Sequence, residues 1–380
     1  MRTQGLRGRL WLRGRFRPGW LLWERGRLTE VEEGEPPRRR RAALQDLGET
    51  RILPGLVDTL LHGFAGVDAA STSPEELDRM TRAVAATGTT TALVGLYPLT
   101  PAAARRSARA WDGWRRLRGR PRCRVPGWHV EGPFVAPEMR GALPAGGIRP
   151  PSARAAAAFV RACGGWLRIS TLAPELPGAA EAAAVFRHHG VLPSIGHTAC
   201  GYEEVLTLAR EGPVAITHLG NRMPPLRARQ PGPIGAAMAG HVPWTGVIPD
   251  GVHVSPDTLA LWSRWPPLRE RLLFQSDAIA AAGLAALDFR AGGQRLRRDG
   301  PVARDVRGGL AGGLDSLFDG LRARIRDGSL DWCRALRGAA EVPGRLLGDC
   351  GRLESGLRAD LVALDEDDTV LRVWIGGRLL

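Results

Sequence analysis

The chain has 380 residues, of which 44% are apolar and 24% charged, a composition typical of a globular protein with one large core. No uncharged run approaches the roughly 18 residues that a membrane span needs, so a membrane-spanning protein is excluded. The formal net charge is +14 and every basic residue is arginine. Without lysine, the chain cannot form a Schiff base, a P-loop or a carbamylated lysine that bridges two metals.

The arginines are spread along the chain, so we expect no nucleic-acid partner despite the positive charge. The five cysteines are widely spaced and form no CxxC motif, which argues against a disulfide framework and against a thiolate zinc site. Arginines interrupt the N-terminal segment, which therefore does not resemble a signal peptide. We expect a cytoplasmic protein with reduced cysteines and no membrane partner.

Short strand patterns open and close the chain. They alternate apolar and polar residues between glycines and prolines. The predicted strands are Arg9–Leu12, Trp20–Trp23, Leu28–Val31, Asp360–Asp365 and Val370–Ile375. We therefore predict a small β domain assembled from residues 1–53 and 350–380.

The central part, residues 54–349, alternates short apolar runs with helical patterns, as repeated βα units around a parallel barrel do. The predicted strands are Thr91–Leu96, Val125–Val130, Leu167–Leu172, Val191–Ile195, Val214–Thr217, Thr245–Ile248 and Arg271–Gln275. The predicted helices are Pro74–Ala86, Ala102–Leu117, Ser152–Cys163, Ala179–His189 and Tyr202–Glu211.

Ionisable residues follow four of the predicted strands: Glu131, His197, His218 and Asp277. A lone histidine at a strand end is more often structural, and a lone aspartate usually caps a helix. Four such residues in a chain with only eight histidines instead indicate a site at the C-terminal rim of a barrel. Two imidazoles and one carboxylate suit Zn²⁺ or Fe²⁺ with an open coordination position.

The segment His129–Phe134 (HVEGPF) resembles the HxEGPF motif of the N-acetylglucosamine-6-phosphate deacetylases, a branch of the amidohydrolase superfamily. Similar motifs extend over nearly the whole chain and together are highly specific. They are Pro54–Asp58 leading to His62, Gly141–Ala142, Ile148–Pro151, Thr171–Glu175, Ser194–Thr198, Thr217–Leu219, Arg229–Gly232, Asp250–Val254, Ser276–Ala278 and Gly356–Val362.

The resemblance implies a deformed (β/α)₈ TIM-like barrel with a β-sandwich domain formed from both chain ends. It implies hydrolysis of N-acetylglucosamine 6-phosphate to glucosamine 6-phosphate and acetate. One divalent metal ion per chain, Zn²⁺ or Fe²⁺, would be held by Glu131, His197 and His218 and would activate a water molecule. Asp277 would act as the general acid/base.

The resemblance also implies a small-molecule substrate, an amino-sugar phosphate, and a homodimer. Asn221, Arg229 and His253 match positions that hold the sugar phosphate in the family, and Ala142 belongs to the substrate pocket. In a dimer, Arg229 would reach the pocket of the neighbouring subunit.

The chain departs from the family pattern at several positions. Leu60 stands where many relatives have the first histidine of an HxH pair. Because leucine cannot bind a metal, we predict a mononuclear site, with His62 and His129 supporting the metal ligands from behind. Other departures are Leu143 for a histidine, Gly220 and Arg222 for an aromatic residue and an alanine, and Gly313 for a serine.

These observations leave three hypotheses. The first is the deacetylase itself. The second is an amidohydrolase that acts on a different N-acyl sugar or amide, because Leu143, Gly220 and Arg222 reshape the pocket. The third is a non-catalytic descendant of the family. The intact set of ionisable residues at the strand ends argues against the third, since buried polar groups without a function are costly to retain.

Overall fold

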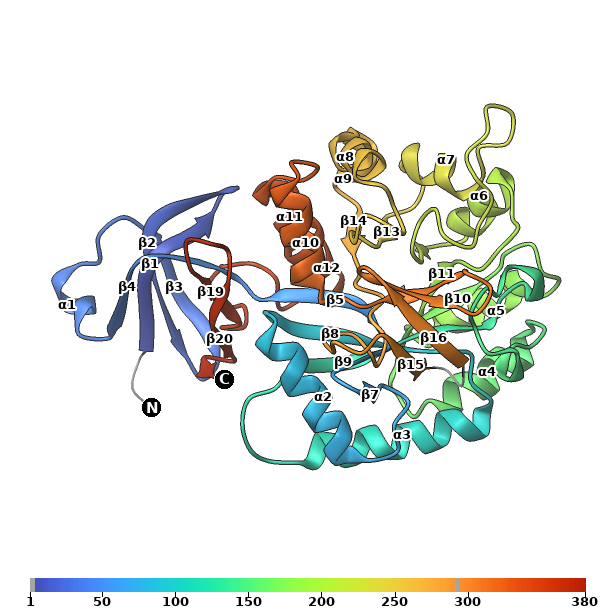
Figure 1. The fold of residues 1–380 in the computed structure, drawn as a ribbon, viewed down its shortest axis with the longest axis horizontal. Coiled ribbons are helices and arrows are strands. Elements are labelled where there is room, and N and C mark those ends of the chain that lie inside the picture. Colours follow the sequence, from blue (N-terminus) through green and yellow to red (C-terminus); the bar gives the residue numbers. More distant parts are fainter. Residues whose placement is uncertain (1–3, 292–293) are drawn as a thin grey trace.

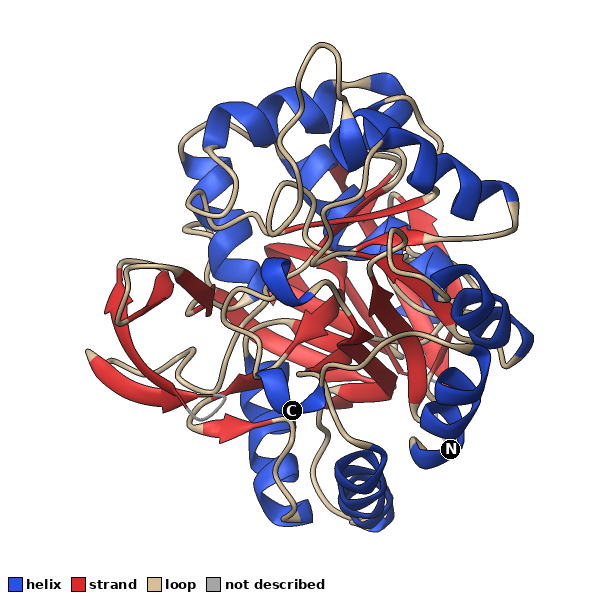
Figure 2. Cartoon of the chain, turned by 90° about the vertical axis from the view of Figure 1, so that its right-hand side faces the viewer, coloured by secondary structure: helices blue, strands red, loops and turns tan. Residues whose placement is uncertain are grey.

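Eight strands of the described part of the chain form one parallel sheet that curls into a barrel. The computed structural model describes residues 4–291 and 294–380. The sheet order is β14-β13-β12-β11-β10-β9-β8-β5, and Figure 2 shows these strands at the centre with helices around them. The strands are β5 (Leu56–Leu61), β8 (Thr89–Leu96), β9 (Arg124–Phe134), β10 (Leu167–Leu172), β11 (Leu192–Ile195), β12 (Ala215–Ile216), β13 (Trp244–Val247) and β14 (Leu272–Phe274).

The barrel is nearly closed between its first and last strands. Leu61 and Ala278 form an isolated parallel bridge, and the Asp277 N–H donates to the Leu60 carbonyl over 3.0 Å. The buried Asp58 carboxylate accepts the N–H groups of Leu60 and Ser276, which ties the two strand ends together. Burial raises the pKa of Asp58 to about 6. The predicted barrel is confirmed, and the aspartate of the Pro54–Asp58 motif has a structural role in it.

Helices cover the outside of the barrel. They are α2 (Pro74–Ala86), α3 (Pro101–Arg116), α4 (Ala153–Ala162), α5 (Ala179–His188), α6 (Tyr202–Arg210), α7 (Gly232–Met238), α8 (Pro256–Arg264), α9 (Pro266–Arg269), α10 (Leu317–Arg326), α11 (Trp332–Leu336) and α12 (Val342–Leu347). Short 3₁₀ turns span Pro137–Met139 and Ala145–Gly147, and a π-helical turn spans Arg337–Glu341. The predicted helices match α2 to α6 within one residue at each end.

Local sequence explains where these helices begin. Ser73, Thr100 and Ser152 each accept a hydrogen bond from the backbone N–H three residues later, as N-cap residues do. Proline occupies the first turn of α2 and α3, where its missing N–H has no cost. The buried faces of α2 to α4 pack with the barrel strands in one continuous core that contains Trp111 and Trp166. Capping and apolar periodicity therefore agree, which is why the sequence locates these helices well.

The two chain ends share a seven-stranded sheet at one side of the barrel, where Figure 1 shows blue and red strands side by side. Its order is β21-β20-β19-β4-β1-β2-β3. The strands are β1 (Gln4–Leu12), β2 (Arg15–Glu24), β3 (Arg27–Glu33), β4 (Leu44–Pro54), β19 (Leu361–Leu364), β20 (Val370–Ile375) and β21 (Arg378–Leu379), with the short helix α1 (Arg38–Arg41) before β4. The β domain is thus built from both termini; the division at residues 1–53 and 350–380 stays a prediction.

A four-stranded antiparallel sheet lies between β14 and α10 and was not predicted. Its strands are β15 (Asp288–Ala291), β16 (Gln294–Asp299), β17 (Val302–Asp305) and β18 (Leu310–Gly313), and a short hairpin, β6 (Gly63–Phe64) and β7 (Val67–Asp68), follows β5. Figure 1 shows β15 and β16 as orange strands in front of the barrel. The strands of this sheet, several of them arginine-rich, lack the apolar runs that identify barrel strands.

Among the described residues, no helix is long and apolar enough to cross a membrane.

Candidate metal centre and substrate pocket

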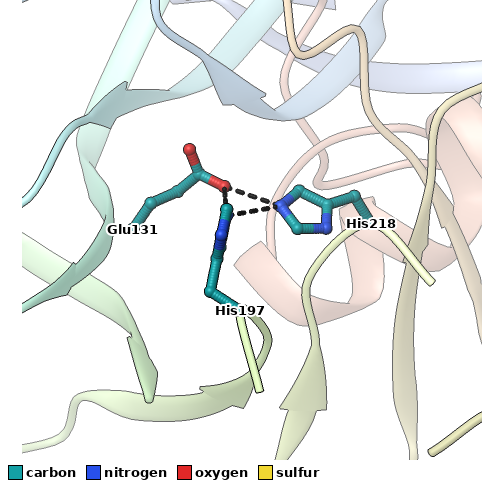
Figure 3. A group of neighbouring side chains, drawn as sticks. All are labelled: Glu131, His197 and His218. Carbon is teal, nitrogen blue, oxygen red and sulfur yellow. Dashed lines mark hydrogen bonds and ion pairs between the residues drawn. The ribbon is translucent and has the colours of Figure 1, made fainter. Parts of the chain in front are cut away.

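Three side chains meet at the C-terminal ends of the barrel strands, as Figure 3 shows. Glu131 lies near the end of β9, His197 follows β11 and His218 follows β12. Glu131 Oε1 lies 3.2 Å from His197 Nε2 and 2.8 Å from His218 Nε2, and the two Nε2 atoms lie 3.1 Å apart. All three residues are at most 5% exposed. The structure therefore brings together the three residues that the sequence indicated as metal ligands.

The backbone around the site is strained. His197, His218 and Asp277 have φ values of 49°, 33° and 48°, in the left-handed region that residues other than glycine rarely adopt. Each such residue costs on the order of 1–3 kcal/mol, and such strain clusters at functional sites. Strain at the ends of three different barrel strands is independent support for a site at this rim.

The donor set fits a divalent metal ion. His197 Nδ1 lies 3.1 Å from the Met139 carbonyl, which only accepts, so Nδ1 carries the proton and Nε2 turns a lone pair toward Glu131 and His218. A cation would bind here, because the His197 lone pair, the Glu131 carboxylate and the His218 Nε2 face one another in a buried place. Although burial opposes ionisation, the close contacts of Glu131 with His197, His218 and His62 hold the pKa of Glu131 well below its usual value, so it is a carboxylate.

His62 directly follows β5 and contacts the same cluster of side chains. Its Nε2 lies 2.9 Å from Glu131 Oε2 and 3.4 Å from Asp277 Oδ1. Burial opposes a charge on His62, but the Asp277 and Glu131 carboxylates outweigh it and raise the pKa to about 10. His62, Glu131 and Asp277 therefore form a second group of potential ligand atoms that shares Glu131 with the first. Leu60, two residues earlier, has no ligand atom to add.

His129 takes no part in the cluster. Its Nδ1 donates to the Thr59 carbonyl over 2.9 Å, and its Nε2 lies 3.1 Å from the Thr171 hydroxyl and 3.3 Å from that of Thr217. Burial lowers the pKa of His129 to about 4, so the ring is neutral. His129 links barrel strands behind the metal centre.

A pocket of about 360 Å³ opens above these residues. Asp277, 9% exposed, lies at its base beside His62. The pocket is lined by His62, Tyr97, Glu131, Met139, Ala142, Leu143, His197, His218, Gly220, Asn221, Arg222, Met223, Ile248, His253, Asp277, Ile279, Leu296, Leu310, Ala311 and Gly312. The cavity has room for a small molecule whose reacting group faces the metal centre.

Comparisons with known proteins agree with this architecture. The N-acetylgalactosamine-6-phosphate deacetylase of Escherichia coli O157:H7 is 31% identical over 336 residues, 86% of this chain and 87% of that protein. The N-acetylglucosamine-6-phosphate deacetylase of Bacillus subtilis is 30% identical over 371 residues, 95% and 92% of the two chains. The crystal structure of N-acetyl-D-glucosamine-6-phosphate deacetylase from Mycobacterium smegmatis has a TM-score of 0.89 at 31% identity and covers 99% of this chain and 100% of that one. This chain belongs to the N-acetylglucosamine-6-phosphate deacetylase family. No family model matches it.

Three of the four residues that the deacetylase resemblance assigned to substrate lie in the pocket. Ala142, Asn221 and His253 line it, together with the metal-centre residues. Arg229 does not line the pocket of its own chain. It is exposed in the loop between His218 and α7, where Arg227 and Gln230 close a turn. Within one chain, Arg229 is therefore not placed to bind the same ligand as Asn221.

Three of the five departures from the deacetylase pattern lie at the pocket. Leu143, Gly220 and Arg222 all line it. Gly220 has a φ of +86°, and a Cβ added there would lie 3.2 Å from Trp262 Cη2. Trp262 of α8 therefore packs where a larger residue at position 220 would need space. Leu143 makes this part of the wall apolar, so it provides no hydrogen-bond donor.

Two further residues belong to the site, and the sequence did not single them out. Asp250 is 8% exposed, and its Oδ2 lies 2.6 Å from His253 Nδ1 while its Oδ1 accepts the N–H groups of Val252 and His253. This arrangement orients the His253 ring. Tyr97 stacks on His62 with ring centroids 4.4 Å apart and an interplanar angle of 4°. The Asp250–Val254 motif contained a signal for Asp250; nothing in the sequence marked Tyr97.

Proposed function

We propose that this protein hydrolyses the acetamide of N-acetylglucosamine 6-phosphate to glucosamine 6-phosphate and acetate. The observation that carries the proposal is the convergence of Glu131, His197 and His218 beside Asp277 at the base of one pocket, in a chain of the deacetylase family. The two donor nitrogens and the carboxylate come from three barrel strands that are distant in sequence, so their meeting is a product of the fold.

We infer that Glu131, His197 and His218 hold one divalent ion, Zn²⁺ or Fe²⁺. When bound, such an ion acts as a Lewis acid that activates water and polarises an amide carbonyl. The hydrogen bond from His197 Nδ1 to the Met139 carbonyl keeps the ligand nitrogen turned toward the site. We propose a mononuclear centre, because Leu60 offers no ligand and the chain has no lysine to bridge a second ion.

In this proposal Asp277 moves the protons. Its carboxylate lies in the pocket with Oδ1 3.4 Å from His62 Nε2, beside the three inferred ligands. Asp277 takes a proton from the attacking water as the water oxygen bonds to the amide carbon. It then delivers that proton to the amide nitrogen, so the C–N bond breaks and the amine leaves neutral. His62, stacked on Tyr97, holds the Asp277 and Glu131 carboxylates in place.

The rest of the pocket suits a sugar phosphate. Asn221 and His253 offer an amide and an imidazole for hydroxyl and phosphate oxygens, and Asp250 keeps the His253 ring oriented. We propose that Arg229 contributes from a neighbouring subunit of a homodimer, because it is exposed and lies outside its own chain's pocket lining. We also propose a cytoplasmic location, which suits the five unpaired cysteines.

A second substrate is favoured by one observation. The relative from Escherichia coli O157:H7, at 31% identity, is named N-acetylgalactosamine-6-phosphate deacetylase. Glucosamine and galactosamine differ only in the orientation of the 4-hydroxyl group, so the same metal centre and Asp277 suit both. The choice between them depends on the sugar-binding wall rather than on the catalytic end.

The test is acetate release from metal-loaded protein. We expect turnover of N-acetylglucosamine 6-phosphate or of N-acetylgalactosamine 6-phosphate, with the corresponding amine as the second product. A panel of unphosphorylated and longer N-acyl sugars serves as the comparison, and metal content is measured on the same sample. Absence of turnover of both 6-phosphates, with one divalent ion bound per chain, would reject the proposal in favour of another amidohydrolase substrate.

A further inference from the structure

Arg222 lies in the wall of the substrate pocket, one residue after Asn221 in the loop that follows β12. Two contacts fix its backbone. The Thr198 N–H donates to the Arg222 carbonyl over 3.1 Å, and the next residue, Met223, is buried. Its φ of 50° is in the left-handed region, which arginine adopts only where the surroundings impose it. The position of Arg222 is therefore determined by the loop, although its side chain is exposed.

The side chain extends across the pocket wall to the loop after β9. A Cβ built on Gly141 would lie 2.2 Å from Arg222 Nε, 2.6 Å from Cζ and 2.9 Å from Cδ. Gly141, with a φ of +57°, thus leaves the space that the guanidinium group occupies. The neighbouring residues Ala142 and Leu143 line the pocket as well. The guanidinium group is therefore held between two loops that both face the substrate.

The charge of Arg222 is not neutralised by the described part of the chain. None of the ion pairs found among the described residues includes Arg222. The carboxylates of the pocket, Glu131 and Asp277, contact His62, and Glu131 contacts His197 and His218 as well. Arg140, in the same loop as Gly141, donates to the neutral Leu143 carbonyl. This loop therefore brings a second positive charge near Arg222 and does not neutralise the first. The guanidinium group is thus a planar cation in the pocket wall that has no carboxylate partner. Such a group suits an anion such as phosphate, which arginine binds in a bidentate manner.

We propose that Arg222 binds the phosphate group of the substrate within the same chain. The inference rests on the proposed function, since it assigns the anionic end of that substrate. It differs from the role inferred for Arg229, which lies outside the pocket lining of its own chain. With Arg222, each pocket contains a phosphate-binding arginine of its own, beside Asn221.

The decisive variant is Arg222→Ala, which installs the alanine that the deacetylase pattern has at this position and is therefore expected to fold. We expect kcat/KM for the phosphorylated sugar to fall about 10- to 150-fold through KM, and turnover of the unphosphorylated sugar to stay unchanged. Arg222→Lys keeps the charge but loses the bidentate geometry and should fall between the two. Arg227→Ala is the matched control, because Arg227 is exposed in the same loop and does not line the pocket.

Calorimetric titration of metal-loaded protein with inorganic phosphate makes the test independent of turnover. Arg222→Ala should weaken phosphate binding at least about 10-fold, and Arg227→Ala should leave it unchanged. Unchanged phosphate affinity in Arg222→Ala, or equal slowing of the phosphorylated and unphosphorylated sugars, would overturn the assignment. If the parent protein hydrolyses neither hexosamine phosphate, the proposed function fails, and the phosphate titration still decides the role of Arg222.

Discussion

At the base of the pocket, Glu131, His197 and His218 are at most 5% exposed and come directly from the ends of barrel strands. Arg222, by contrast, lies exposed in the pocket wall on the long loop between β12 and α7, and Arg229 lies exposed on the same loop outside the pocket lining. Glu131, His197, His218 and Asp277 at the base all lie in segments that match the deacetylase motifs, whereas the wall carries the departures at Leu143, Gly220 and Arg222. Strand ends are held by the barrel, so a ligand there cannot move without changing the fold, but a loop residue can change while the barrel stays the same.

The largest effect is expected from removing a residue at the base. His197→Ala removes one of the two nitrogen ligands that we infer, so metal content should fall from about one ion per chain to nearly none, and activity should be lost. Elemental analysis and turnover on the same samples measure this. Two tightly bound ions in the parent protein would reject the mononuclear centre. His189→Ala, a histidine outside the pocket lining, is the matched control and should retain both metal and activity.

Asp277→Asn separates proton transfer from metal binding. Asparagine keeps the shape of the side chain but cannot take up the proton, so kcat should fall by about 10²-fold or more while metal content stays near one ion per chain. Activity within a few fold of the parent would remove Asp277 from the mechanism. Loss of metal together with activity would instead place Asp277 among the metal ligands. Asp277 Oδ1 lies 3.4 Å from His62 Nε2, in the second group of potential ligand atoms.

Arg229→Ala tests the proposed contribution of one subunit to the pocket of its neighbour. We expect kcat/KM for the phosphorylated sugar to fall about 10- to 150-fold, with the unphosphorylated sugar nearly unaffected. Because Arg229 lies outside the pocket lining of its own chain, the loss should be complemented in mixed dimers with an Asp277→Asn partner. The mixture then contains pockets with an intact Asp277 and a neighbour's intact Arg229. Failure to recover activity in the mixture, or a monomer in solution, contradicts the role across subunits.

The smallest effect is expected where one side chain acts through another. Asp250→Asn weakens the contact that orients the His253 ring, since an amide in place of the carboxylate loses the charge-assisted hydrogen bond. We expect KM to rise about 2- to 12-fold, the equivalent of one hydrogen bond, with kcat and metal content unchanged. Asp257→Asn changes an exposed aspartate in the first turn of α8 and provides a comparison of the same chemical change. A fall in kcat alone would place His253 at the reacting group instead.

Most of the barrel and the base of the site were predictable from residues close together in the chain. Apolar runs identify strands such as β10, and a polar residue directly after each run must lie at the same rim, because parallel strands all end there. The sheet formed by β15–β18 was not predictable in this way. Its strands pair antiparallel over a small core of their own, Leu296 among it, and carry no long apolar run.

The sequence by itself determined the barrel, the rim on which Glu131, His197, His218 and Asp277 lie, and the family to which the motifs point. Periodicity and strand-end position are local properties, so they can be interpreted without coordinates. Only the tertiary structure decided that His129 ties strands together, that Asp250 orients His253, and that Arg222 extends over Gly141 into the pocket while Arg229 does not line it. These depend on the direction of side chains between loops that are distant in sequence, which no local pattern encodes.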